Sequence, residues 1–250
     1  GAKEITLLGQ NVNAYFDKNK RLSDLIYSLD KLNGIKRIRY TTSHPKDVTE
    51  DLIEAHRDCN KLMPLLHLPV QSGSSKILKM MNRKHNIEQY LRILEKLKDK
   101  KNKIKFSSDF IIGYPGEKNE DFNETIALMK KVKFINSYSY VFSSRPGTPS
   151  AKLETVDFNL AKKRLQSFQL LSDEIKRDYR KTLVNNHSIV LFENKLESKD
   201  MYFGRDEYLN SVIASSKINL AGSIFKVKIT DYNHSTLFGE VINDERSFAA

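Results

Sequence analysis

Cysteine is almost absent from this sequence and tryptophan is absent altogether, since the 250 residues contain only Cys59. A single thiol excludes an internal disulfide, a zinc site of several thiolates and an iron–sulfur cluster bound by three cysteines of this chain. Long hydrophobic runs are also missing, because every apolar stretch is interrupted by Lys, Asn or Ser well before the roughly 20 residues that a membrane span needs. We therefore expect no membrane contact and a reducing compartment, the cytoplasm.

Positive charge is abundant and unevenly distributed. Lys and Arg outnumber Asp and Glu by 42 to 31, which gives a net charge of +11. Residues 1–181 carry 35 basic and 22 acidic side chains, a net charge of +13, whereas residues 182–250 carry 7 and 9, a net charge of −2. This excess favours a polyanionic partner, although a lysine run such as residues 96–105 is also typical of a solvated helix face. With 39% hydrophobic residues, the chain has enough apolar surface to form a folded core.

Apolar, β-branched segments alternate with segments of helical periodicity through the first 140 residues. The helical segments repeat apolar residues every three or four positions, as Leu22, Leu25, Ile26 and Leu29 do. The predicted strands are residues 5–8, 37–42, 65–70, 104–112 and 137–142, and the predicted helices are residues 22–32, 49–58, 75–81, 87–98 and 119–131. Strands that alternate with helices form right-handed parallel crossovers, so we predict an α/β fold, either a doubly wound sheet or part of a parallel β/α barrel.

Polar residues collect after each predicted strand. Both α/β architectures place their chemistry at the carboxyl ends of the strands. We therefore predict that the five polar tips ring one cavity. They comprise residues 9–11, 41–45, 71–74, 113–117 and 143–148.

A long helical pattern over residues 158–182 connects this part to one of different character. After it, short alternating runs at residues 188–192, 209–213, 224–229 and 237–241 are separated by glycines. Four or five strands in about 65 residues without a helix predict a small all-β barrel of the size that binds oligonucleotides. We therefore expect two domains, residues 1–181 and residues 182–250.

Two motifs allow a structural as well as a functional interpretation. The turn of residues 113–117 contains Gly113 and Gly116, whose missing Cβ atoms leave room for a ligand, yet a plain strand-to-helix turn has the same pattern. His67 lies inside an apolar strand, where a hydrogen-bonded core residue is more common than a base or a metal ligand. A Ser-His-Asp nucleophile is possible in composition, but the sequence has no Gly-x-Ser-x-Gly elbow.

Two arginines stand where they could contact an anion. Arg145 lies in a rigid turn rich in Pro and Gly, where its guanidinium can bind phosphate or carboxylate in a bidentate manner or pair with a neighbour. Arg205 precedes a predicted strand of the small domain. The aromatic residues of that domain can stack on bases or fill its core, and they are Tyr202, Phe203, Tyr208, Phe225 and Phe238.

Five strings, in this order, resemble the radical-SAM methylthiotransferases. They are GQNVNAY at residues 9–15, TTSHP at 41–45, LHLPVQSGS at 66–74, DFIIGYPGE at 109–117 and RPGTP at 145–149. The tail from residue 182 is similar to the C-terminal TRAM domain of that family. On this resemblance, the first domain is a partial radical-SAM barrel that lacks its first strand and the cysteine loop after it. A start at Gly1 without Met agrees with a piece of a longer protein.

The resemblance implies a tRNA-modifying transferase. It implies S-adenosylmethionine (SAM) as radical source and methyl donor, and methylthiolation at C2 of N6-dimethylallyladenosine, position 37 of the tRNA anticodon loop. It also implies two 4Fe-4S clusters in the full-length protein, and this chain has the cysteines for neither. The expected partner is the tRNA anticodon loop, while the sulfur and electron donors stay unassigned.

The candidate site residues occupy matching positions at the strand ends. We predict no catalytic residue and no metal ligand in this chain. The predicted SAM-binding residues are Thr42, Ser43, Gln71, Ser72, Ser107 and Asp109. The predicted tRNA-binding residues are Gln10, Asn11, Tyr140, Ser143 and Arg145 at the barrel mouth and Arg205 on the small barrel.

Three other interpretations compete with this one. A sister methylthiotransferase would act on threonylcarbamoyl-adenosine in tRNA or on an aspartate of a small-subunit ribosomal protein. The chain by itself could be an RNA-binding piece without catalytic activity, which we expect of the fragment while we expect an enzyme of its parent. An ordinary phosphate-handling barrel enzyme would need a ligand set that the sequence does not show.

Overall fold

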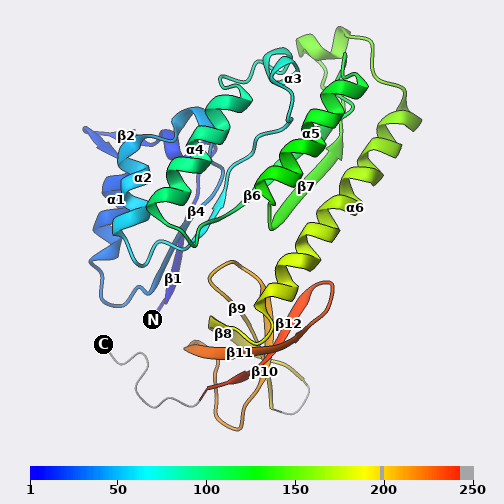
Figure 1. The fold of residues 1–250 in the computed structure, drawn as a ribbon. Coiled ribbons are helices and arrows are strands. Elements are labelled where there is room, and N and C mark those ends of the chain that lie inside the picture. Colours follow the sequence, from blue (N-terminus) through cyan, green and yellow to red (C-terminus); the bar gives the residue numbers. More distant parts are fainter. Residues whose placement is uncertain (198–199, 243–250) are drawn as a thin grey trace.

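The computed structural model describes residues 1–197 and 200–242. Its first part alternates strands with helices (Figure 1). The main strands are β1 (Glu4–Leu7), β4 (Arg37–Tyr40), β5 (Leu65–His67), β6 (Lys105–Ile112) and β7 (Asn136–Val141), and a short hairpin joins β2 (Phe16–Asp17) to β3 (Lys20–Arg21). The helices are α1 (Leu22–Asp30), α2 (Glu50–Asp58), α3 (Ser75–Met80), α4 (Ile87–Lys100), α5 (Asn119–Val132) and α6 (Phe158–Leu183). No helix in the described part is long and apolar enough to cross a membrane.

The five main strands are parallel, as predicted, but they form two groups. β1 pairs with β4, and β5, β6 and β7 form a three-stranded sheet in that order. A single parallel bridge between Ile38 and Leu62 connects the two groups. Together the two groups form one curved layer of strands, which we call the strand wall. Helices α1, α2, α4 and α5 lie along its outer side (Figure 1).

The alternation along β6 shows how the sequence divides its side chains between the two faces of this wall. Phe106, Phe110 and Ile112 are buried in the core under the helices. The intervening Ser107 and Asp109 point to the opposite, inner face, because successive side chains of a strand alternate. Ser107 lies level with His67 of the neighbouring β5. The polar residues of β6 are thus directed into the interior of the partial barrel.

The second part is a closed barrel of five strands, which confirms the prediction of a small all-β barrel. Its strands are β8 (His187–Lys195), β9 (Met201–Arg205), β10 (Ser211–Ser215), β11 (Ile224–Tyr232) and β12 (Thr236–Val241), and they close in the order β10-β12-β11-β8-β9. The sequence pattern did not predict β9, because Gly204 reads as a turn there. In the structure Gly204 packs so closely on Leu191 and Phe192 of β8 that a Cβ atom would collide with them.

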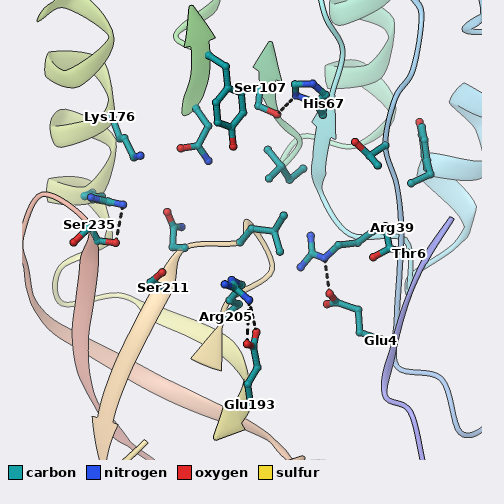
Figure 2. Close-up of a pocket in the computed structure, with 18 of the residues that line it drawn as sticks. Glu4, Thr6, Arg39, His67, Ser107, Lys176, Glu193, Arg205, Ser211 and Ser235 are labelled. Carbon is teal, nitrogen blue, oxygen red and sulfur yellow. Dashed lines mark hydrogen bonds and ion pairs between the residues drawn. The ribbon is translucent and has the colours of Figure 1, made fainter. Parts of the chain in front are cut away.

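Buried arginines of β4 fasten the small barrel to the strand wall. Arg37 donates to the carbonyl oxygens of Arg205 (3.0 Å) and Ile189 (2.7 Å), and Arg39 donates to that of Glu207 (3.0 Å). Figure 2 shows Arg39 reaching down from the wall toward the small barrel. Each guanidinium therefore donates hydrogen bonds to backbone carbonyls that would face solvent if the small barrel stood alone.

Two further contacts join the parts along α6 and β6. Arg180, in the last turns of α6, donates to the carbonyl oxygens of Asn233, His234 and Ser235 in the β11–β12 turn. The Tyr208 hydroxyl donates to the carbonyl oxygen of Lys103 (2.9 Å). The domain boundary predicted at residue 182 falls in the last turn of α6.

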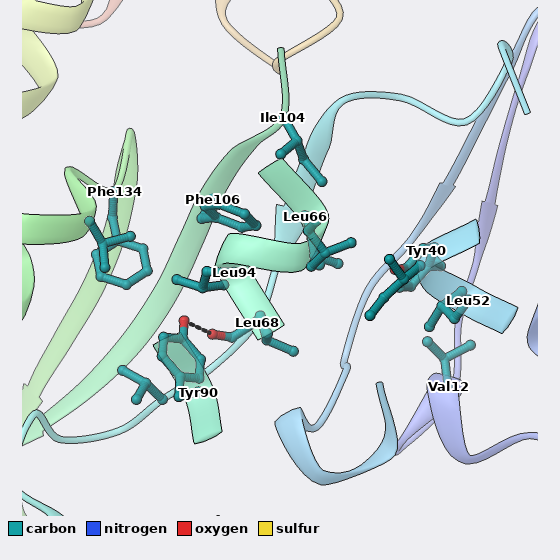
Figure 3. Packing of buried hydrophobic residues seen from close by; sticks show 14 of the residues in the cluster. Val12, Tyr40, Leu52, Leu66, Leu68, Tyr90, Leu94, Ile104, Phe106 and Phe134 are labelled. Atoms are coloured by element: carbon teal, nitrogen blue, oxygen red, sulfur yellow. Dashed lines mark hydrogen bonds between the residues drawn. The ribbon is translucent and has the colours of Figure 1, made fainter. Parts of the chain in front are cut away.

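The main core lies between the strand wall and the helices (Figure 3). Phe110 of β6 packs against Phe134, with ring centroids 5.6 Å apart, and against Phe168 of α6, at 4.7 Å. The buried Tyr90 of α4 keeps its hydroxyl satisfied by donating to the carbonyl oxygen of Leu68 (2.9 Å). This core holds β5 and β6 in register and so positions the polar residues on their inner face.

Candidate functional site

The tip of β4 is tightly bent and leaves one buried hydroxyl open. Thr42 has a positive φ of 60° and donates to the carbonyl oxygens of Gly9 and Thr41, so its exposed side chain supports the bend. Ser43 is 5% exposed, and its Oγ has no hydrogen-bond partner among the described residues. A buried hydroxyl without a partner is costly, so Ser43 is suited to a ligand group.

The loop after β1 lies against this tip. Asn13 holds His44 by accepting from its backbone N–H (2.8 Å) and donating to its carbonyl oxygen (2.9 Å). Asn11 donates to Asp47 (2.7 Å), while its buried Oδ1 has no partner in the described part of the chain. Gln10 is exposed. Of the two residues predicted for tRNA here, Asn11 is partly engaged by the fold and Gln10 is open to solvent.

The residues at the tip of β5 are used mainly for hydrogen bonds within the fold. Gln71 extends the pairing of β5 with β6, because its N–H donates to the Asp109 carbonyl and its carbonyl accepts from Ile111, both at 2.9 Å. The Oγ of Ser72, which is 1% exposed, lies 3.4 Å from the Thr125 hydroxyl and accepts from the Ser74 N–H (3.1 Å). The Ser72 side chain is thus used to join this loop to α5.

His67, Ser107 and Asp109 form a polar row on the inner face of the wall. The Nδ1 of His67 lies 3.0 Å from the Ser107 hydroxyl, and its Nε2 lies 3.5 Å from an Asp109 carboxylate oxygen. The ring also meets the edge of Tyr138, at 6.1 Å between centroids. His67 is therefore a half-buried residue of the barrel interior, hydrogen-bonded through Nδ1 and with its Nε2 near the Asp109 carboxylate, as the hydrogen-bonded interpretation expects. The row can hold a polar ligand and relay a proton between a hydroxyl and a carboxylate.

The carboxylate of Glu117 occupies the turn of residues 113–117. Glu117 accepts from the Gly113 N–H (3.1 Å) and from Nη1 of Arg164 on α6 (2.8 Å). Both side chains of this ion pair are buried, and burial raises the pKa of Glu117 while Gly113 and Arg164 oppose that rise. The structural interpretation of this turn is thus the one that the contacts support.

A cluster of two histidines and one arginine lies beside the tips, and of its members the sequence pattern pointed only to His44, within residues 41–45. It comprises His44, Arg83 and His85, with the two imidazole rings 5.5 Å apart and Arg83 donating to the Pro69 carbonyl (3.2 Å). Burial, Arg83 and His44 together lower the pKa of His85 to about 4, so His85 is neutral near pH 7. Burial also lowers the pKa of Arg83, and Asp109 opposes this shift. Arg83 and His85 lie in a lysine-containing loop between two helices, where no strand end pointed to them.

A cavity of about 740 Å³ lies between the inner face of the wall and the small barrel (Figure 2). It is lined by Thr6 of β1, Arg39 of β4 and His67 of β5, among others, and by residues of α6 and the small barrel. Of the twelve predicted site residues, it contains Ser107 and Arg205. Of the five tips predicted to ring one basin, this lining includes a residue of just one, Thr41, and Tyr140, Ser143 and Arg145 are exposed side chains outside it.

The radical SAM superfamily model matches residues 1–129, which is more than half of the chain. The chain belongs to the radical SAM superfamily. Among solved structures, it is similar to the radical SAM enzyme coproporphyrinogen III oxidase from Escherichia coli, with a TM-score of 0.51 and 13% identity over 74% of this chain and 50% of that one. This likeness supports the superfamily's barrel fold for the first part.

Curated relatives of this radical SAM chain share one name. A tRNA-2-methylthio-N(6)-dimethylallyladenosine synthase of Pelagibacter ubique is 52% identical over 100% of this chain and 57% of its own length. The protein of the same name from Zymomonas mobilis is 43% identical, again over 100% and 57%. The chain thus spans little more than half the length of the curated relatives that it matches.

The superfamily implies SAM and an iron–sulfur cluster, and the residues present fit these two groups differently. Ser43 offers a buried hydroxyl without a partner in the described residues at the strand tips, and Asp109 offers a half-buried carboxylate, which suits an amino-acid-bearing nucleoside. A cluster does not fit this chain. Its one cysteine, Cys59, is 1% exposed, burial raises its pKa to about 11, and the described residues contain no group of His, Cys, Asp and Glu that could hold a metal.

Proposed function

We propose that the protein containing this chain methylthiolates C2 of N6-dimethylallyladenosine in tRNA, at position 37 of the anticodon loop, and uses SAM to do so. The single observation that supports it most is the shared name of relatives 43–52% identical over nearly the whole chain. The radical SAM barrel and its polar inner face suit the chemistry. tRNA as the substrate implies the cytoplasm as the place of action.

The strand tips are the proposed SAM site. Ser43 would donate or accept through its open Oγ, and Asp109 would accept from a hydroxyl or ammonium group of the ligand. His67 and Ser107 would hold the orientation of Asp109 from below. When bound, SAM supplies the radical and the methyl group, while the chain itself binds, orients and excludes water. Thr42, Gln71 and Ser72 would act by shaping the loops around it.

The small barrel is the proposed RNA-binding module, a TRAM domain. Its Arg205 is half-exposed beside Phe203, with the guanidinium 5.3 Å from the ring centroid. Gln10, Tyr140, Ser143 and Arg145 are exposed side chains of the first domain that can contact the loop, and Asn11 offers its open Oδ1 beside them. The first domain carries the positive charge, so it supplies the general attraction to phosphate, and the small barrel acts through local contacts.

Mass spectrometry of tRNA nucleosides tests the proposal. A strain without the gene should lose 2-methylthio-N6-dimethylallyladenosine and accumulate N6-dimethylallyladenosine, and the intact gene should restore the product. Loss of the methylthio derivative of threonylcarbamoyl-adenosine, with the dimethylallyl product intact, would assign the sister activity instead. Mass spectrometry of ribosomal proteins from the same strain covers the remaining alternative, because loss of the modified aspartate with the tRNA product intact would assign the ribosomal substrate.

A further inference from the structure

The α6 side of the 740 Å³ cavity carries two positive charges without a carboxylate partner. Lys176 and Arg180 lie one turn apart on α6, and both line the cavity. Within the described residues, Lys176 makes no hydrogen bond and no ion pair. Arg180 uses its two Nη atoms on backbone carbonyls, which are neutral, and its buried Nε has no acceptor in the same part of the chain.

The two other arginines of this cavity each have a carboxylate partner. Arg39 lies 3.1 Å from Glu4, and Arg205 lies 2.7 Å from Glu193. Asp173, almost one turn before Lys176 on α6, lies 3.7 Å from the imidazole of His234 and forms no ion pair with Lys176 within the described residues. The positive charge that remains is therefore concentrated on Lys176 and Arg180.

This arrangement places two like charges close to each other. Burial and the neighbouring Arg180 lower the pKa of Lys176, and Asp173 opposes this only in part. Two like charges in a partly desolvated position repel each other, and Lys176 has no hydrogen bond in the described part of the chain that would offset this cost. An anion between them would be attracted to both charges, through charge-assisted hydrogen bonds of the kind that Lys and Arg form with phosphate.

We propose that this cavity binds a phosphate group of a nucleotide, with Lys176 and Arg180 as its cationic ligands. Lys176 extends from α6 into the cavity, opposite Ser107 (Figure 2). Hydroxyl and amide groups for a ribose surround the same space, from Asn136, Tyr138, Ser211 and Ser235. A volume of about 740 Å³ lies in the range of about 300–1,000 Å³ typical of small-ligand sites. The inference rests on the proposed function in one respect, because it takes the phosphate to be a phosphodiester of the substrate RNA.

Matched lysine variants of α6 test the site. Lys176→Met removes the cavity charge, and Lys163→Met removes an equal charge from an exposed position of the same helix. Binding of a fluorescently labelled single-stranded RNA heptamer to the intact protein is followed by anisotropy at several salt concentrations. We expect Lys176→Met to weaken binding about 3- to 10-fold and to reduce the salt slope by about one, since one phosphate contact is lost. Lys163→Met should change neither value by as much.

Two further measurements separate this site from the alternatives. Because Arg180 repels Lys176, Lys176→Met should raise the thermal midpoint of the protein without RNA, whereas replacing a merely structural lysine would lower it. Unlabelled AMP should compete with the RNA far better than inorganic phosphate does, and equal competition would contradict a nucleotide site. Equal RNA affinity and salt slope for the two variants would overturn the proposal. This outcome is independent of the nucleoside analysis, which tests the reaction and not the cavity.

Discussion

Ser43 and Ser72 follow neighbouring parallel strands at the same end of the barrel, yet the structure uses them differently. The Oγ of Ser72 accepts from Ser74 N–H and meets Thr125 of α5, so it helps to hold the fold. The Oγ of Ser43 is equally buried and meets nothing among the described residues. A polar group that the fold satisfies is structural, whereas one that the fold leaves open is available for a ligand.

The same contrast separates the charged residues of α6. Arg164 is buried against Glu117 and completes a turn of the first domain. Lys176, three turns further along, is desolvated without a carboxylate. We therefore expect substitutions at the satisfied positions to cost stability, and substitutions at the open positions to cost ligand binding.

The largest effect is expected at the satisfied ion pair. Arg164→Met leaves the Glu117 carboxylate buried and unpaired, which should lower the free energy of unfolding by about 3–5 kcal/mol. Denaturant titration of the purified protein measures this loss. The double variant Glu117→Gln with Arg164→Met should recover part of it, because no uncompensated charge remains. A single variant as stable as the exposed Lys163→Met would contradict a structural role for this pair.

Buried histidines should make the fold sensitive to acid. His56 is bonded to the Tyr40 hydroxyl at 2.6 Å, and burial lowers its pKa to about 3, while that of His85 falls to about 4. Since both values lie below the ordinary 6.5, the unfolded chain binds more protons between these limits. Stability should therefore be complete above pH 6.5 and fall below it, by up to about 1.4 kcal/mol per pH unit for each histidine.

Unfolding titrations at pH 7.5, 6 and 5 measure this slope. His85→Gln should make it shallower, whereas the same change at the exposed His187 serves as the control. An identical slope in His85→Gln and the parent protein would show that His85 takes no part in it.

Alanine substitutions of the two serines test this difference most directly. Ser72→Ala should lower the free energy of unfolding by about 1 kcal/mol, because it leaves the Ser74 N–H without its acceptor. Ser43→Ala should leave stability unchanged and weaken SAM binding several-fold in the intact protein. Unfolding titrations and SAM-binding isotherms of both variants measure the two quantities. Reversed results would remove the distinction between satisfied and open groups.

The smallest stability effect is expected at Arg205. Its pair with Glu193 is half-exposed, so Arg205→Ala should cost less than about 1 kcal/mol. If the small barrel binds RNA, the same variant should weaken RNA affinity several-fold. Glu193→Gln, which frees Arg205, serves as the counterpart and should strengthen it.

The sequence predicted most of the helices and strands, although not β9 or the β2–β3 hairpin, and it did not predict which side chains contact each other. The strand from residue 104 to 112 was predictable because apolar residues begin and end the segment between two helical patterns, and this composition is a local property. Whether Ser72 is satisfied depends on Thr125, which lies 53 residues away in the sequence. The row of His67, Ser107 and Asp109 likewise required the register of β5 on β6. Ser43 and Ser72 are the same residue type in similar loops, so the sequence alone could not show which of them has a hydrogen-bond partner.

The most direct test of the distinction between open and satisfied groups is an experimental structure of the intact protein with SAM bound. We expect one polar atom of SAM within hydrogen-bond distance of the Ser43 Oγ and another within hydrogen-bond distance of the Asp109 carboxylate. Ser72 should still be bonded to Thr125. SAM held elsewhere, with the Ser43 hydroxyl still without a partner, would contradict it.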